Sequence, residues 1–295
     1  MSVPVAYLGI VLIWSTTPLA IQWSAQEAGY SFAVLARMAI GLTVAGLIVV
    51  AWRIGLPLHA RARRAYLLGG LALFGAMSLT YWGARFIHSG LISVLFGLSP
   101  LLTSALARVW LDEPPLRPTQ LAGLLLGVAG LAIIFLHDHG VAQTEALAGL
   151  AAVLTAVLVY SGGLVGLKRI ADDSPPLATT VGTLGVSLPL FAALWWLADG
   201  RPPVDIGPRS AAAIAYLGVF GSVIGFALYY YVIKHLDASR IALITLITPV
   251  IALLLGHALN GEAIGLRLAA GTTCILGGLV LHQLPSWRRS VGLAA

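Results

Sequence analysis

The sequence predicts an all-α membrane protein in which ten transmembrane helices form two inverted five-helix repeats. Three observations lead to this fold class. Of the 295 residues, 59% are hydrophobic and only 9% are charged, against about 25% charged residues in a soluble domain. Apolar stretches long enough to cross a hydrocarbon core of about 30 Å recur along the chain. The residue pattern of 81–113 returns at 230–262.

The apolar stretches predict helices, because they lack the alternation of polar and apolar residues that barrel strands show. Backbone polar groups inside a bilayer find no water, so such spans have to be helical. The predicted spans are 4–24, 31–53, 65–84, 89–110, 118–137, 147–167, 175–197, 211–233, 238–259 and 265–284. The first span has no positive flank before it and no small-residue cleavage site after it, so we expect a retained helix and not a signal peptide.

The first span places Trp14 at its centre, and Ser15, Thr16 and Pro18 follow closely. An indole N–H at the centre of a bilayer needs a hydrogen-bond partner. We interpret Trp14, Ser15 and Thr16 as candidate substrate-binding residues facing a cavity, with packing between helices as the alternative reading of Trp14. Pro18 distorts the helix and is a hinge candidate.

The second and third spans add four candidates. Arg37 lies about two turns into the second span, where its long side chain either reaches toward the membrane surface or binds a substrate carboxylate or a helix-end carbonyl. Tyr81 and Trp82 lie near the end of the third span. They are either interfacial aromatics or residues lining an entrance for a ring-bearing substrate. Ser78, one turn deeper than Trp82, shares its face.

The fourth and ninth spans each carry a proline at their middle, Pro100 and Pro249. A proline removes one backbone donor and bends a helix, so both residues are hinge candidates. Ser99 and Thr248 precede them, and their hydroxyls either repair the backbone or face a ligand. Both are therefore candidate substrate-binding residues.

The remaining spans contribute tyrosines and small residues. In the sixth span, Tyr160 takes the place that Trp14 has in the first span, and we interpret it as a binding residue, with plain packing as the alternative. Tyr230, near the end of the eighth span, is either an interfacial aromatic or a further binding residue at an entrance for a ring-bearing substrate. Gly123 and Gly127 in the fifth span fit tight helix contacts. The single cysteine, Cys274 in the tenth span, excludes an internal disulfide.

The chain contains one pattern twice. Superposition needs no gap over 33 residues and has the order aromatic, base, apolar run, mid-helix proline, glutamate. The paired residues are Tyr81 with Tyr230, Arg85 with Lys234, Ile92 with Ile241, Pro100 with Pro249, and Glu113 with Glu262. We expect repeats at 1–140 and 141–295. Because each contains five helices, the second is inverted, which is a common construction in secondary transporters.

The net charge of +6 is an orientation signal and does not indicate nucleic-acid binding. With Arg37 set aside, twelve Lys and Arg residues fall on the side of the N-terminus and four on the other side, which places both termini in the cytoplasm. The twelve are Arg53, Arg61, Arg63, Arg64, Arg108, Arg117, Lys168, Arg169, Lys234, Arg240, Arg288 and Arg289, and the four are Arg85, Arg201, Arg209 and Arg267.

Several function classes fit poorly. The spans hold no nucleophile–base pair, zinc motif or paired carboxylates, which argues against a membrane-embedded enzyme. His137 and His139 lie in a short loop without further ligands, so we expect no metal site and no cofactor. No Asp or Glu lies at the middle of a span. A carboxylate-coupled pump or a carrier of bulky cations usually has one there, so a neutral or zwitterionic substrate fits better.

The order of residues in both halves resembles the EamA-type unit of the drug/metabolite transporter superfamily, present in two copies. The first copy carries the resemblance in Trp14, Ser15, Arg37, Tyr81, Ser99, Pro100, Glu113, Gly123 and Gly130. The second carries it in Tyr160, Ser161, Tyr230, Thr248, Pro249, Glu262, Gly271 and Gly278. No arginine in the second half corresponds to Arg37.

Among such proteins, the chain looks most like the YddG-type exporters of aromatic and other neutral amino acids. This resemblance implies a monomeric secondary transporter of the bacterial inner membrane. It would work by alternating access on a small molecule, an amino acid or a related metabolite, with the lipid bilayer as its surroundings. A nucleotide-sugar or drug carrier of the same superfamily is the alternative.

Overall fold

The structure is a computed structural model that describes residues 2–111, 117–135, 141–236 and 238–290. At 135, 141–143, 229–230, 233–234, 238–242 and 285–290 it describes the backbone alone. Glu113, His137 and His139 lie outside the described residues. The same holds for the side chains of Tyr230 and Lys234, so the proposals made for these residues from the sequence stay predictions.

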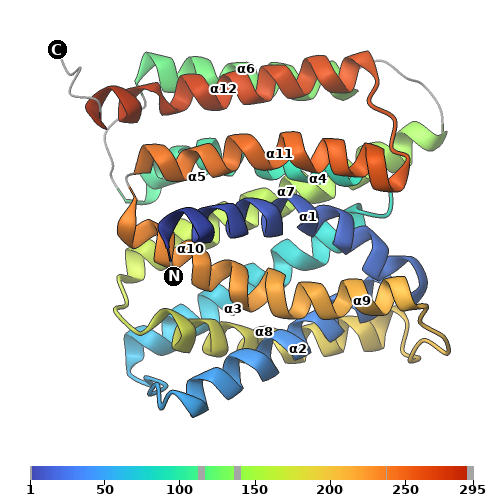
Figure 1. The fold of residues 1–295 in the computed structure, drawn as a ribbon, viewed down its shortest axis with the longest axis vertical. Coiled ribbons are helices and arrows are strands. Elements are labelled where there is room, and N and C mark those ends of the chain that lie inside the picture. The colour runs from blue at the N-terminus through green and yellow to red at the C-terminus, as the bar shows by residue number, and fades with distance from the viewer. Residues whose placement is uncertain (1, 112–116, 136–140, 237, 291–295) are drawn as a thin grey trace.

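Every element in these ranges is helical (Figure 1). The helices of the first half are α1 (Val3–Ala28), α2 (Tyr30–Ala51), α3 (Ala60–Gly83), α4 (Ser89–Phe96), α5 (Ser99–Trp110) and α6 (Pro118–Phe135). Those of the second half are α7 (Val141–Ile170), α8 (Pro176–Ala198), α9 (Pro208–Tyr216), the π-helix η1 (Leu217–Ile224), α10 (Gly225–His235), α11 (Ala238–Asn260) and α12 (Leu266–Ser290).

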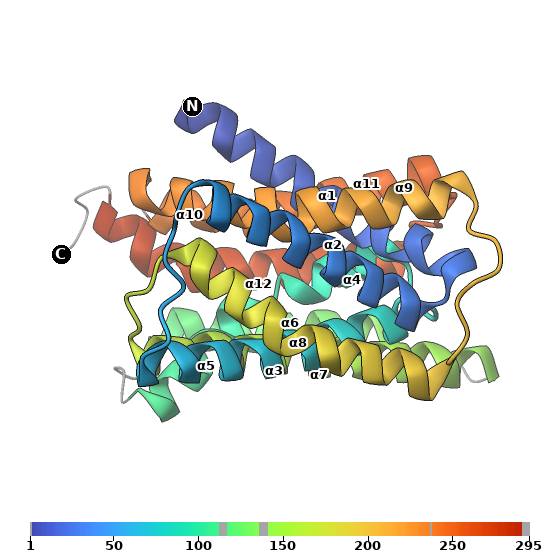
Figure 2. The ribbon, with the colours of Figure 1, turned by 90° about the horizontal axis from the view of Figure 1, so that it is seen from below.

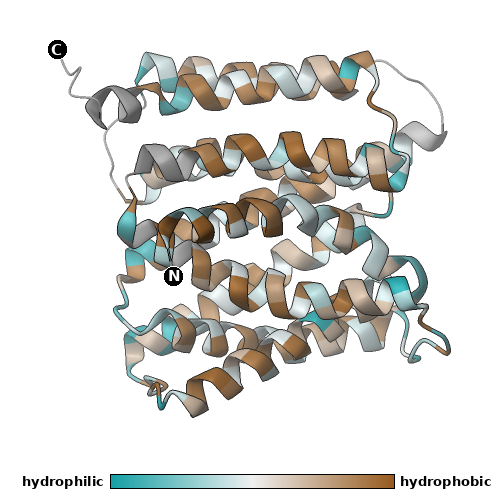
Figure 3. Cartoon of the chain, viewed as in Figure 1, coloured by the Kyte–Doolittle hydropathy of each residue, from teal (hydrophilic) through white to brown (hydrophobic). Residues whose placement is uncertain are grey.

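The helices lie side by side with their axes roughly aligned, and α1 begins at the same end of the bundle at which α12 finishes (Figures 1 and 2). Hydrophilic residues gather at the two ends, whereas the outward helix faces between them are apolar (Figure 3). Leu8, Leu47, Leu71 and Leu254, for example, are between 56% and 65% exposed. A surface of this kind is stable in lipid and would aggregate in water. The protein is therefore a multi-pass membrane protein.

Eight helical segments of the described chain are long and apolar enough to cross a membrane. They are Val3–Ala28, Tyr30–Ala51, Ala60–Gly83, Ser89–Trp110, Thr144–Ile170, Pro176–Ala198, Pro208–Leu228 and Leu243–Asn260. Pro118–Ile134 is apolar but shorter. All-helical membrane architecture is thus confirmed, while the count of ten spans stays a prediction.

Two predicted spans are not continuous α-helices. The fourth breaks after Phe96. Pro100 has no N–H to donate to the Phe96 carbonyl, and its ring would crowd that carbonyl in a continuous helix. Gly97 and Leu98 bridge the gap, with Leu98 N–H donating to the Leu95 carbonyl at 3.0 Å. Pro18 and Pro249, in contrast, lie inside the unbroken helices α1 and α11.

The eighth predicted span contains η1 between α9 and α10. η1 packs closely on α2 at Gly218. A Cβ added at this glycine would lie 2.5 Å from the side chain of Ile40. Short π-helical segments within α-helices are frequent at functional sites. This segment places Ser222 opposite Arg37.

α6 and α12 pack against each other through reciprocal glycine contacts. A Cβ at Gly130 would lie 2.6 Å from the carbonyl oxygen of Gly271, and one at Gly271 would lie 2.6 Å from that of Gly130. Gly123 and Gly278 meet in the same mutual way. The residue numbers rise on one helix as they fall on the other, so the two helices are antiparallel. The small residues allow the backbones to touch.

Candidate functional site

A cavity of about 330 Å³ lies inside the bundle. Its lining residues come from α1, α2, α3, α4, α5, α7, α8, η1, α10 and α11, whereas α6 and α12 contribute none. Six residues proposed from the sequence line it: Trp14, Pro18, Arg37, Ser99, Tyr160 and Thr248. They belong to five different helices and both halves of the chain, so the fold gathers them around one space.

Arg37 brings a positive charge into this cavity. Its side chain is 5% exposed, and its Nε donates to Ser222 Oγ at 3.1 Å. Ser222 Oγ in turn donates to the Leu217 carbonyl at 3.0 Å, five residues back along η1. Arg37 Nη1 is buried and has no hydrogen-bond partner in the structure. Among the described lining residues there is no Asp or Glu, so no acidic side chain of this part of the lining neutralises the charge.

The rest of the lining is aromatic, aliphatic and hydroxylated. Trp14, Phe96, Tyr160 and Phe226 supply rings, and the rings of Phe96 and Tyr160 meet edge to face with centroids 5.9 Å apart. Hydroxyl groups come from Thr17, Thr80, Ser93, Ser99, Thr179, Thr180, Thr183, Ser222, Thr245 and Thr248. A few polar groups in an otherwise apolar cavity are typical of small-molecule sites.

Several other candidate residues lie away from the cavity. Thr16 Oγ1 is hydrogen-bonded to the Tyr216 hydroxyl at 2.6 Å, and Ser15 is fully buried with an unpartnered hydroxyl. Tyr81 is likewise buried with an unpartnered hydroxyl, Ser78 is half-buried with a buried, unpartnered hydroxyl oxygen, and the Trp82 ring packs on that of Phe86 at 4.9 Å. Pro100 and Pro249 are also absent from the lining.

Helical periodicity explains which positions sequence reasoning missed. In α1 the lining residues are Trp14, Thr17, Pro18 and Ile21, which share one face at steps of three and four. Ser15 and Thr16, the immediate neighbours of Trp14, point elsewhere. In α3 the same spacing selects Leu73, Ala76, Met77 and Thr80, and passes over the adjacent Ser78 and Tyr81.

The cavity reaches the end of the bundle at which α1 begins. Leu167 in the last turn of α7, and Thr179 and Thr180 in the first turn of α8, belong to its lining. A solute at that end would enter the cavity between α7 and α8. The opposite end is closed by a polar network.

The closing network ties α1 to α11 and to the start of α4. Gln22 Nε2 donates to the carbonyls of Ala84 and Ile87, at 3.2 and 2.7 Å. Asn260 Nδ2 donates to Gln22 Oε1 and to Glu262 Oε1, at 3.2 and 3.0 Å. Glu262 also accepts the backbone N–H of Ser89 at 3.1 Å, so it caps α4 with a negative charge, a favourable placement at a helix N-terminus.

His59, Asp172 and Asp173 form a cluster at the other end, with ligand atoms within 4.8 Å of one another. His59 Nδ1 accepts the Ala62 N–H at 3.2 Å, so the neutral ring carries its proton on Nε2, which faces Asp172 at 3.7 Å. A metal-bound histidine donates through its second ring nitrogen. The observed hydrogen bond is the reverse of that arrangement, and the cluster does not fit a metal site.

Comparison with known proteins gives consistent results. The model of the EamA-like transporter family matches residues 2–136 and again 147–282. A probable terminal-alkyne amino-acid exporter of Streptantibioticus cattleyicolor is 25% identical over 293 residues, covering 94% of this chain and 95% of that protein. The uncharacterized inner membrane transporter YedA of Escherichia coli is 25% identical, covering 88% of this chain and 83% of its own length.

Protein PagO of Salmonella typhimurium is 26% identical over 269 residues, covering 90% of this chain and 87% of its own. A crystal structure of another protein superposes with a TM-score of 0.67 and 24% sequence identity, over 98% of this chain and 99% of that one, which supports the fold. The family and several of these relatives are named as transporters, and none is named as an enzyme. With two matches that together span most of its length, the chain belongs to the EamA-like transporter family.

Proposed function

We propose that this transporter is an exporter or facilitator of amino acids with aromatic or other neutral side chains, or of similar small metabolites, across the bacterial inner membrane. The observation that carries the proposal is the unpaired guanidinium of Arg37 in a cavity whose lining holds no acidic residue. A solute with a carboxylate supplies the missing charge. The name of the Streptantibioticus cattleyicolor relative, an amino-acid exporter, supports this substrate class.

The cavity matches the parts of a neutral amino acid. Arg37 Nη1 would donate to the α-carboxylate, and charge-assisted bonds of this kind are the stronger ones. Trp14, Tyr160 and Phe96 offer ring faces to the ammonium group. Met38, Met77 and other aliphatic residues line the remainder. The volume of about 330 Å³ lies at the lower end of the usual range for small-molecule sites, about 300–1,000 Å³.

A nucleotide sugar fits this cavity less well. Its two phosphates would bring more negative charge than the single arginine of the lining neutralises, and burying an unpaired charge is costly. The amino-acid reading therefore has the better charge balance.

Alternating access is the mechanism we infer, acting between inverted repeats at 1–140 and 141–295. Three features support inversion. The α3–α4 and α10–α11 connections, which correspond in the superposed repeats, lie at opposite ends of the bundle (Figure 1). α6 and α12, which also correspond, are antiparallel, and their glycine contacts are reciprocal. The cavity reaches one end and the polar network closes the other. Two oppositely oriented units can exchange these roles.

Both termini face the cytoplasm in this proposal, because the described arginines concentrate at the end where α1 begins. The name of the Escherichia coli relative, an inner membrane transporter, agrees with the proposed location. A monomer suffices, since the cavity lies within one chain.

The test is flux in proteoliposomes loaded with a panel of labelled amino acids. We expect movement of Phe, Trp, Met or Thr, and little movement of phenylalanine amide, which lacks the carboxylate. R37Q should reduce flux of the acid about 10- to 100-fold, since hydrogen bonds to a charged group contribute about 1.5–3 kcal/mol. W14A should also lower flux at unchanged expression.

T16V is the matched control, because Thr16 is bonded to Tyr216 and lies outside the cavity lining. Its flux should stay close to that of the wild type. Equal transport of the acid and the amide, or an R37Q variant with normal flux, would contradict the proposed contact between Arg37 and the substrate carboxylate. If every amino acid in the panel is ignored while another metabolite moves, the substrate assignment is wrong.

A further inference from the structure

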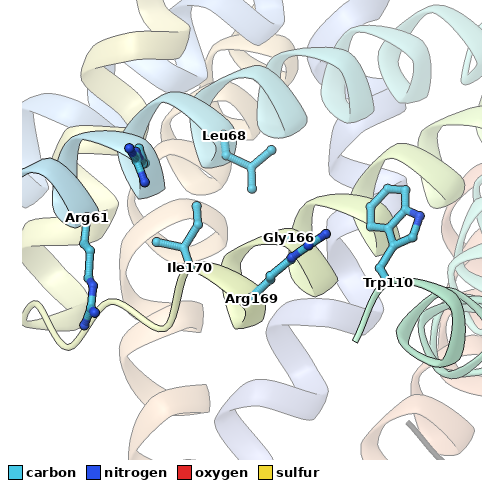
Figure 4. A pocket seen from close by; sticks show the side chains of 7 residues that line it. Arg61, Leu68, Trp110, Gly166, Arg169 and Ile170 are labelled. Atoms are coloured by element: carbon cyan, nitrogen blue, oxygen red, sulfur yellow. The ribbon is translucent and has the colours of Figure 1, made fainter. Parts of the chain in front are cut away.

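A second hollow, of about 690 Å³, lies at the end of the bundle where α1 begins. We call it the arginine groove and define it by Arg61, Arg64 and Leu68 of α3, Trp110 of α5, and Arg169 and Ile170 of α7. Figure 4 shows Arg61 at one side and Trp110 at the other, with Leu68, Ile170 and Arg169 between them. Nothing in the proposed transport mechanism uses this groove.

The groove and the transport cavity share no lining residue. Arg169 follows Tyr160 by nine residues, which at about 100° per residue places the two on opposite sides of α7. Tyr160 lines the cavity, and Arg169 lines the groove. Next to the groove, Leu67 and Leu71 of α3 and Val109 of α5 are 54%, 56% and 71% exposed. In a membrane protein, this outward surface is in contact with lipid.

Small residues of α7 shape the apolar wall of the groove. A Cβ at Gly166 would lie 2.6 Å from Leu68 Cδ2, so leucine occupies the space that a larger residue would fill. The Trp110 ring lies over Gly162, 3.6 Å from the position of an added Cβ. Tryptophan is common at the level of the lipid headgroups, where an apolar ring and a polar N–H suit the boundary.

Within the described residues, no carboxylate compensates the charge of the groove. Arg61, Arg64 and Arg169 are exposed, and in the described part of the chain none of them has a carboxylate oxygen within 4.0 Å. The acidic residue that follows Ile170 most closely, Asp172, faces His59 instead. Three arginines therefore line one hollow beside an apolar wall, at one end of the bundle. Guanidinium forks match phosphate oxygens in geometry as well as charge.

We propose that the arginine groove binds an anionic phospholipid, with its charged headgroup against the arginines of the groove and an acyl chain along Leu68 and Ile170 toward the exposed leucines of α3. Basic pockets between transmembrane helices on the cytoplasmic side bind such headgroups in general. The apolar wall distinguishes a lipid from inorganic phosphate, which would gain only the charge contacts.

The experiment measures lipid retention by the full-length purified protein, without reference to transport. Native mass spectrometry would count phosphatidylglycerol and cardiolipin retained from mixed micelles, against phosphatidylcholine of equal chain length. Salt at about 0.3 M shortens the Debye length and suppresses general surface attraction. We expect preferential retention of the anionic lipids and about a fivefold weaker apparent affinity for each of R61Q, R64Q and R169Q, the effect of about 1 kcal/mol per basic residue.

The matched control is R63Q, which removes an exposed charge from the same turn of α3 at a position outside the groove. It should change retention by less than any groove variant. W110L, which removes the ring and keeps the charges, should also weaken retention. Equal losses in R63Q and R64Q, or unchanged retention in the triple variant, would overturn the proposal. Millimolar inorganic phosphate that displaces the lipid completely would show an anion site without lipid specificity, which also contradicts it.

Discussion

Arg37 depends on one neighbour for its position. Its Nε donates to Ser222 Oγ, and that hydroxyl is itself held by the carbonyl of Leu217 across the π-turn. Gly221, next to Ser222, leaves room for the guanidinium, because a Cβ there would lie 3.3 Å from Arg37 Nη2. The wider winding of η1 therefore both anchors the charge and makes space for it.

Ser222→Ala tests this anchor. With the hydroxyl removed, Arg37 Nε loses the hydrogen bond to Ser222 and the side chain gains freedom, so the proposed carboxylate contact becomes weaker. We expect KM for the transported amino acid to rise about tenfold, equivalent to about 1.4 kcal/mol, with a smaller change in maximal rate. Proteoliposome uptake over a range of substrate concentrations measures both quantities.

Ser187→Ala serves as the control, since Ser187 is equally buried, bonds the Leu184 carbonyl of its own helix, and lies outside the cavity lining. Its KM should match the wild type. A normal KM in the Ser222 variant would show that Arg37 is positioned by packing alone.

Among the elements, α6 and α12 stand apart from the cavity and touch through glycine. A methyl group at Gly123 would overlap the carbonyl oxygen of Gly278, and His282 N would lie 3.0 Å away. Backbone atoms cannot withdraw as a flexible side chain can. The contact therefore requires glycine on both helices, whereas many other glycines of the chain meet no such restriction.

Gly123→Ala should destabilise the protein by about 1–3 kcal/mol, the usual cost of forcing extra volume into a packed contact. A lower midpoint of thermal unfolding in detergent would report it. Gly46→Ala is the matched control, because Gly46 also lies within a helix but a Cβ there has nothing within 4 Å. Its midpoint should be unchanged or slightly higher, since alanine favours helix. Equal midpoints for the two variants would contradict the contact.

The existence of the helices followed from the sequence, because a bilayer leaves an apolar stretch of about 20 residues no other structure. The positions at which the helices break or change their winding could not be predicted from the sequence in the same way. Pro18, Pro100 and Pro249 look alike in the sequence, yet only at Pro100 does the helix break. There, Gly97 lies against Leu279 and Pro249 of distant helices, and such tertiary contacts are not visible in local sequence. Gly218 of η1 likewise packs against Ile40 of α2, a contact between distant parts of the sequence.

For the site, the sequence identified the residue types and the depth in the membrane, but not the helix faces. Trp14, Arg37 and Tyr160 were found because a large polar group in the middle of a span is unusual. Thr17 and Thr183 were missed because single threonines are common in membrane helices. Applying helical spacing from Trp14 would have selected Thr17 in place of Thr16.

At the scale of the whole molecule, the inverted arrangement makes a topological prediction. Corresponding positions of the two repeats, residues 85 and 234, should lie on opposite sides of the membrane. Single cysteines introduced as R85C and K234C in a C274A background can be tested with an impermeant maleimide in intact cells. We expect labelling at 85 without cell lysis and labelling at 234 only after it.

The C274A background without a new cysteine is the control and should remain unlabelled. Labelling of both positions from the same side would contradict the inversion and, with it, the proposed alternating access. R53C, at the end where α1 begins, should behave as K234C does.

In the described part of the chain, the residues of the closing network are not matched one for one in the other repeat. The repeats pair Asn260 with Leu111 and Gln22 with Lys168, and a leucine cannot replace the amide that bonds both Gln22 and Glu262. If the repeats alternate as proposed, we expect the two gates to differ in strength and the empty carrier to rest facing the basic end. Such a bias would not change the equilibrium distribution of the solute across the membrane. It would favour binding of the solute from one side when its concentration there is low. For the export proposed above, a resting state open to the cytoplasm would favour binding of solute from inside the cell.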